Sequence, residues 1–201
     1  MAEIIENSYT ATTFQTNLKE DGMTLLHHAV ADMNYDAVKE MTKVSFFRDI
    51  ANACSEQTGV TPLMCISPSS SNEIKIFDLL LQNGANLTAI TKEGGLSCLH
   101  LASMQGNVRL VDHIIKLTKQ IDPMFSVNSR FANNTHTTVS IACNMGHIDT
   151  VNLLLENEAD LMYLNAHGLN AMDTIVGSDN LDLLRCVYEK HYRKYRKDLK
   201  Q

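Results

Sequence analysis

The 201-residue chain has no tryptophan and only three prolines, and aromatic residues make up 6% of it. Its apolar content of 44% includes ten methionines, and a core of Leu, Ile, Met, Ala and Val suits helices better than sheets. No apolar run approaches the roughly 18 residues of a membrane span. The first residues lack the basic and apolar regions of a signal peptide. We therefore expect a helical protein of the cytosol or nucleus that makes no membrane contact.

Sequence motifs for catalysis and for metal binding are also lacking. No C-x-x-C or H-E-x-x-H spacing, no glycine-rich nucleotide loop and no G-x-S-x-G nucleophile occurs. The five cysteines are odd in number and widely spaced, which favours reduced thiols over disulfides. Cys98 and Cys143 lie in apolar helical blocks and are interpreted as buried and inert. We predict no catalytic residue, no metal site and no cofactor, and hence a protein that is not an enzyme.

The net charge of −6 is unevenly distributed. Residues 189–201 hold six Lys/Arg against two Asp/Glu, whereas the other 188 residues hold 11 against 21. An acidic body repels nucleic acid and favours another protein with a basic or apolar contact surface as its partner. Only residues 190–201 offer nucleic acid a basic surface.

One segment returns along the chain in altered form, at spacings of 37, 36, 40 and 33 residues. Three clear copies read GMTLLHHA from Gly22, GVTPLMCI from Gly59 and GLSCLHLA from Gly95. Two weaker copies, THTTVSIA and GLNAMDTI, begin at Thr135 and Gly168. A fixed period of this length indicates a repeat architecture.

Each copy contains residues that begin and end a short helix. Thr24 and Thr61 stand where a short side chain N-caps a helix. Pro62 occupies the first turn, where a backbone N–H would have no hydrogen-bond acceptor within the helix, so proline is tolerated there. Gly106 and Gly146 follow the apolar block, where a left-handed C-cap ends the helix. A second amphipathic helix comes next. The unit is helix–turn–helix–loop, and its apolar face must be covered by a neighbouring copy.

This pattern resembles the ankyrin repeat, which combines G-x-T-P-L-H-x-A, G-H-x-x-x-V and L-L-L-x-x-G-A. The resemblance implies an all-α, ankyrin-repeat solenoid of stacked helix–turn–helix units with projecting loops and a C-terminal capping helix. It implies structural roles for His27, His100 and His147, bonded within and between repeats. In the last two copies, Ser140 and Asp173 stand at the position that His27 and His100 occupy in the earlier ones. Glu158 replaces the closing glycine of the fourth copy. The segment Asp21–His27 is also similar to the first repeat of inhibitor-of-NF-κB proteins, but their acidic paired-serine motif is absent from residues 1–20.

The predicted organisation has three parts. Residues 1–19 form an N-terminal arm, either loosely docked or ordered by a partner or by phosphorylation. Residues 20–188 form the repeat domain, and residues 189–201 a basic C-terminal helix or tail. The five repeats lie near residues 20–57, 58–92, 93–132, 133–165 and 166–188.

Repeat spacings above 33 residues indicate insertions. They are predicted at residues 43–57, 67–72 and 118–134, and are interpreted as projecting loops that offer contacts.

An apolar stripe runs along the C-terminal segment at steps of 4, 4, 3 and 4 residues. We interpret it as the face by which a capping helix covers the last repeat, with the basic residues in solvent. The alternatives are a nuclear-import or acidic-partner patch, and a surface for nucleic acid or anionic lipid. The stripe consists of Leu184, Tyr188, Tyr192, Tyr195 and Leu199.

The resemblance implies that a partner binds the loop tips and the inner face of the first helices. We predict an interface centred on Leu96, Met104, His136 and Met145, in a non-enzymatic adaptor, inhibitor or regulatory subunit. The alternatives are a substrate-recruiting adaptor of a ubiquitin ligase, and a nucleic-acid- or chromatin-associated factor that uses the basic tail. The full predicted set is Met23, Val60, Leu96, Met104, Gln105, His136, Asn144, Met145 and Leu169.

Overall fold

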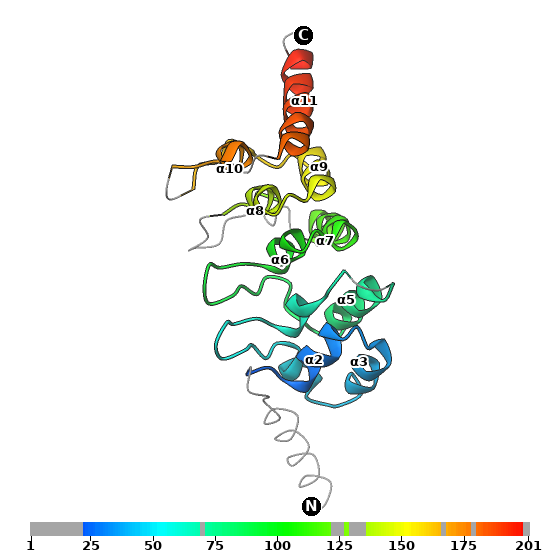
Figure 1. Ribbon diagram of the computed structural model, residues 1–201. Helices are drawn as coiled ribbons and strands as arrows, with labels where there is room; N and C mark the ends of the chain where they lie inside the picture. Colours follow the sequence, from blue (N-terminus) through cyan, green and yellow to red (C-terminus); the bar gives the residue numbers. More distant parts are fainter. Residues whose placement is uncertain are drawn as a thin grey trace, which may run out of the picture. The chain divides into compact units, whose positions relative to one another are not determined.

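A computed structural model describes residues 22–68, 71–121, 127–128, 136–165, 168–177 and 180–198 (Figure 1). In these ranges the regular elements are helices and no strand occurs, which confirms the predicted all-α class. None of the described helices is both long and apolar enough to cross a membrane. The predicted N-terminal arm lies outside the described residues. The chain divides into two compact units, Met1–Cys98 and Leu99–Gln201.

The first unit consists of short helices around a shared apolar core. Its elements are α2 (Leu25–Ala31), α3 (Tyr35–Met41), α4 (Phe47–Ala51), the 3₁₀-helix η1 (Pro62–Cys65) and α5 (Glu73–Gln82). α2 packs against α3 and η1, and α3 packs against α5. The side chains with almost no exposed surface include Leu26, Ile50, Leu63, Phe77 and Leu80.

The insertion predicted at residues 43–57 is not a projecting loop, so this prediction was wrong. It contains α4, in which Phe47, Ile50 and Ala51 are buried. The extra length enlarges the core, because its apolar side chains pack inward. The insertion predicted at residues 67–72 lies between η1 and α5, where residues 69 and 70 fall outside the described ranges.

The second unit alternates short and long helices. α6 (Cys98–Met104) begins at its edge, and α7 (Val108–Ile121), α8 (Thr138–Asn144), α9 (Ile148–Glu156), α10 (Ala171–Gly177) and α11 (Leu181–Asp198) follow. α8 packs against α9 and α10, and α9 packs against α7 and α11 (Figure 1). The short and the long helices therefore form two layers. The insertion predicted at residues 118–134 starts inside α7, and most of it lies outside the described residues.

α11 caps the unit, but not by the predicted stripe. Leu183 and Val187 are fully buried, whereas Leu184 is half-buried and Tyr188 is 61% exposed. The prediction was wrong because the helix packs through Leu183 and Val187, each of which stands one residue before a residue of the predicted stripe. The predicted boundary between residues 188 and 189 falls inside α11. Of the other stripe residues, Tyr192 and Tyr195 lie where only the backbone is described, and Leu199 is outside the described range.

Candidate protein-binding surface

The first repeat opens with a histidine that serves two partners. The Thr24 backbone N–H donates to His27 Nδ1 at 3.1 Å, and the Thr24 hydroxyl lies 2.7 Å from the same atom. Since Nδ1 accepts, Nε2 carries the hydrogen and donates to the Val60 carbonyl at 3.0 Å. His27 therefore caps its own helix and ties it to the next loop.

The second repeat keeps the position of Thr61 but not its hydrogen bond. Thr61 has extended N-cap geometry and its hydroxyl is buried, yet this oxygen finds no hydrogen-bond partner. Pro62 stands at the first helical position as predicted, and the helix that follows is a 3₁₀-helix. The predicted side-chain cap at Thr61 was therefore wrong.

The two weaker copies keep the cap with other side chains. The Thr137 backbone N–H donates to Ser140 Oγ at 3.0 Å, and the Ser140 N–H donates to Thr137 Oγ1 at 3.2 Å. Asn170 and Asp173 make the same reciprocal pair at 2.8 and 3.1 Å. These short side chains cap the helix locally, and Ser140 lacks the length by which an imidazole reaches the following repeat.

His100 is the buried counterpart of His27 in the third repeat. It is 1% exposed and is hydrogen-bonded to the backbone of His136. Burial lowers the pKa of His100 to about 4, against the opposite effect of the bond to His136. The imidazole is therefore neutral at pH 7, as a structural bridge between repeats requires.

The turn after α6 requires glycine for two reasons. Gly106 has φ +68°, and a Cβ there would lie 2.7 Å from Nδ1 of His147. His147 is held against the turn by the bond from Nε2 to the Met104 carbonyl at 3.0 Å.

The turn after α8 also contains a glycine in the left-handed region. Gly146 has φ +74°, and the nearest atom to a Cβ added there would be Asn180 Nδ2 at 3.3 Å. The predicted left-handed C-caps are confirmed at both glycines.

Two non-glycine residues occupy left-handed positions. Met33 stands in the first repeat where Gly106 and Gly146 stand in later ones, and it has φ +55°. Glu158 has φ +67° where the second repeat has Gly84. The backbone geometry of the repeat is therefore maintained at a conformational cost where the glycine is missing.

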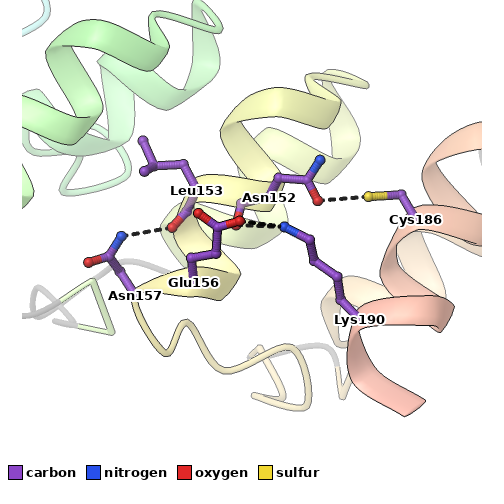
Figure 2. A network of polar contacts seen from close by, with 6 residues as sticks. All are labelled: Asn152, Leu153, Glu156, Asn157, Cys186 and Lys190. Atoms are coloured by element: carbon purple, nitrogen blue, oxygen red, sulfur yellow. Dashed lines mark hydrogen bonds and ion pairs between the residues drawn. The ribbon is translucent and has the colours of Figure 1, made fainter. Parts of the chain in front are cut away.

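The last repeat is attached through helix surfaces, as Figure 2 shows. Cys186 Sγ on α11 donates to Asn152 Oδ1 on α9 at 2.8 Å. Lys190 Nζ lies 2.8 Å from Glu156 Oε1, and both side chains are partly in water. Asn157 Nδ2 donates to the Leu153 carbonyl at 2.9 Å and closes the end of α9.

The predicted loop-tip residues differ in exposure. Met23, Val60 and Leu96 are half-buried, whereas His136 is exposed and Leu169 is 51% exposed. Their backbones close the turns, since the carbonyls of three of them accept an N–H at 2.8 to 3.0 Å across the loop. The three are Val60, Leu96 and Leu169.

The predicted inner positions lie at the ends of α6 and α8. Met104 is half-buried, Gln105 and Asn144 are exposed, and Met145 is 46% exposed. The bond from His147 to the Met104 carbonyl ties these two helix ends together. Met104, Gln105, Asn144, Met145 and His136 all belong to the second unit, whereas Leu96 belongs to the first.

Two loop asparagines that bridge repeats were missed from the sequence. Asn52 Nδ2 donates to the Gly84 carbonyl at 2.8 Å, and its Oδ1 accepts from the Asn86 N–H at 2.7 Å. Asn128 makes the same pair of bonds to the carbonyl of Glu158 and the N–H of Asp160, at 2.9 and 2.8 Å. Each stands seven residues before a repeat opening, which is the signal that would have found it.

Comparison with known proteins decides the family. Residues 69–165 and 99–198 match a family model described as ankyrin repeats (3 copies), and together these ranges span more than half of the chain. The chain belongs to the ankyrin repeat family. The E3 ubiquitin-protein ligase KEG of Arabidopsis thaliana is 29% identical over an alignment of 189 residues, which covers 90% of this chain and 11% of that protein. The chain thus spans about a tenth of the length of this curated relative.

As a member of the ankyrin repeat family, the chain is a protein–protein interaction module, and the family is typically non-enzymatic. Among the described residues, no group of three or more His, Cys, Asp or Glu side chains is arranged to hold a metal ion. Cys98 and Cys143 are buried as predicted, and burial raises the pKa of the Cys143 thiol to about 12. A thiol with this pKa is a poor nucleophile at pH 7.

Proposed function

We propose that the chain acts as a small adaptor, inhibitor or regulatory subunit that binds one protein partner through the ends of α6 and α8. The observation that supports this site is the bond from His147 to the Met104 carbonyl, which ties the end of α6 to the turn after α8, where Met145 is 46% exposed. Methionine adapts to different apolar surfaces and is frequent where proteins bind peptides. His136 and Leu169 extend the proposed surface along the loop tips.

The acidic body supports a partner whose contact surface is basic or apolar. From residue 131 to residue 184 the chain has seven Asp/Glu and neither Lys nor Arg. A surface of one sign attracts the opposite sign and speeds association. The five free thiols support action in a reducing compartment, such as the cytosol or nucleus.

The proposed surface is tested by a double variant, Met104→Asp with Met145→Asp, used as bait in affinity purification with mass spectrometry. Each new carboxylate would be desolvated by a bound partner, so we expect the partner captured by the wild type to be lost. Met162→Asp is the matched control, because Met162 is 52% exposed and lies in the loop after α9. Circular dichroism verifies that all variants are folded. Capture that survives the double variant would contradict this site.

A second function, substrate recruitment for a ubiquitin ligase, is favoured by one observation. The similarity to the ligase KEG extends over 90% of the chain. If the chain recruits substrates, ligase subunits will be enriched with the bait, and depletion of the chain will lengthen the lifetime of another captured protein. Enrichment of the partner without any ligase subunit favours the simple adaptor or inhibitor.

A further inference from the structure

The terminal helix α11 carries apolar residues on two opposite sides. One side holds the buried Leu183 and Val187 and the hydrogen bond from Cys186 to Asn152 on α9, a helix against which α11 packs. The other side carries Leu181, which is 75% exposed, and Tyr188, which is 61% exposed. At about 100° per residue, the centres of these two sides lie roughly 150° apart around the helix.

The spacing of this stripe continues in the sequence beyond Tyr188. The sequence repeats Leu181, Leu184 and Tyr188 eleven residues later as Tyr192, Tyr195 and Leu199. A period of 11 residues corresponds to about 3.67 residues per turn, which is the spacing expected for residues on one face of a nearly straight helix. Figure 1 shows the backbone of the C-terminal half of α11 extending past α9 and α10.

Charge is segregated along the same helix. Residues 181–189 hold two acidic residues and one basic residue, whereas residues 190–198 hold five basic residues and one acidic residue. Two copies of α11 in antiparallel orientation would place the acidic half of each against the basic half of the other. Parallel copies would place the basic halves together and repel.

We propose that the chain self-associates as a two-fold symmetric dimer, in which α11 pairs antiparallel with α11 of a second copy through the stripe that begins at Leu181 and Tyr188. One self-complementary patch is the usual arrangement of a homodimer. An 18-residue helix is about 27 Å long, so the interface is small and the dissociation constant is expected in the micromolar range. The dimer does not depend on the proposed partner surface on α6 and α8.

The test is sedimentation velocity of the full chain between about 1 and 300 µM, a range that brackets micromolar dissociation constants. We expect the wild type to shift from monomer to dimer. The variant Leu181→Gln with Tyr188→Gln should raise the dissociation constant at least about tenfold, because both exposed apolar contacts are removed. Leu164→Gln is the matched control, since Leu164 is 55% exposed in the loop between α9 and α10, and it should leave dimerisation unchanged.

Charge reversal tests the orientation. Asp182→Lys with Glu189→Lys, and separately Arg193→Glu with Arg196→Glu, should each weaken the homodimer, whereas an equal mixture of the two variants should dimerise again. Added salt should weaken the wild-type dimer, because attraction between the halves is screened. A chain that stays monomeric to about 300 µM, a dimer indifferent to Leu181 and Tyr188, or a dimer strengthened by salt would each overturn the proposal.

Discussion

The junction between the third and fourth repeats and the junction between the fourth and fifth are held by different chemistry. At the first junction, the buried imidazole of His100 bonds the His136 backbone, and His147 bonds the Met104 carbonyl over Gly106. At the second, the bonds come from side chains on α9 and α11 that are partly in water. Exposed ion pairs contribute little to stability.

This difference shows what a degenerate repeat retains. Ser140 and Asp173 still cap their helices, because capping needs only a short polar side chain. Ser140 is too short to bridge to the fifth repeat as His100 bridges to the fourth, so the fifth repeat is held by the packing of α10 on α8 and of α11 on α9. Local stability follows such contacts, and we expect the second junction to open more readily than the first.

Mild acid should weaken the first junction most. Burial lowers the pKa of His100 to about 4 in the folded chain, from 6.5. Between pH 6.5 and pH 4 the imidazole of His100 is protonated in the unfolded chain but not in the folded chain. Its contribution to the free energy of unfolding is therefore fully present above pH 6.5 and is lost as the pH falls toward 4. Titration of His100 alone should lower the free energy of unfolding by about 3 kcal/mol between pH 7 and pH 4.

Urea unfolding followed by circular dichroism at several pH values measures this loss. His100→Gln is the control, because glutamine does not titrate in this range, and its stability should depend less on pH. A His100 ring proton that titrates near pH 6.5 in nuclear magnetic resonance spectra would refute the expectation.

Replacing each of the two turn glycines by alanine should destabilise the two junctions by different amounts. Both glycines have positive φ, so alanine costs about 1 to 2 kcal/mol at either position. At Gly106 the new Cβ would also lie 2.7 Å from His147, whereas at Gly146 the nearest atom is 3.3 Å away. Overpacking against a fixed ring adds about 2 kcal/mol, so Gly106→Ala should unfold at clearly lower urea concentration than Gly146→Ala. Equal losses would show that His147 is not held rigidly.

The parts of the molecule that sequence predicted are those in which a local pattern determines the structure. Gly106 and Gly146 were found because a left-handed turn demands glycine. α4 was missed because its five residues carry no repeated motif, and only tertiary packing identifies Phe47 and Ile50 as core.

The stripe of α11 was misassigned because the helix has two apolar sides. The longer, aromatic pattern around Tyr188 was chosen, although the buried side chains of the helix are Leu183 and Val187. Periodicity shows that a face is apolar, but it does not show what covers it. The position of Met145 at the end of a first helix was predicted by aligning its segment with the ankyrin repeat, and the residues around it would not have been enough to predict it.

Restoring the closing glycine of the fourth repeat should produce the smallest effect. Glu158 has φ +67° and an exposed side chain, so Glu158→Gly should relieve the backbone and stabilise the chain by about 1 kcal/mol. Glu158→Ala removes the same side chain without relieving φ, and it should bring no gain. At Met33 the same change to glycine should destabilise, because this side chain is only 6% exposed and its burial outweighs the strain. If Glu158→Ala stabilises as much as Glu158→Gly in urea unfolding, the gain comes from removing a negative charge from the acidic body rather than from backbone relief.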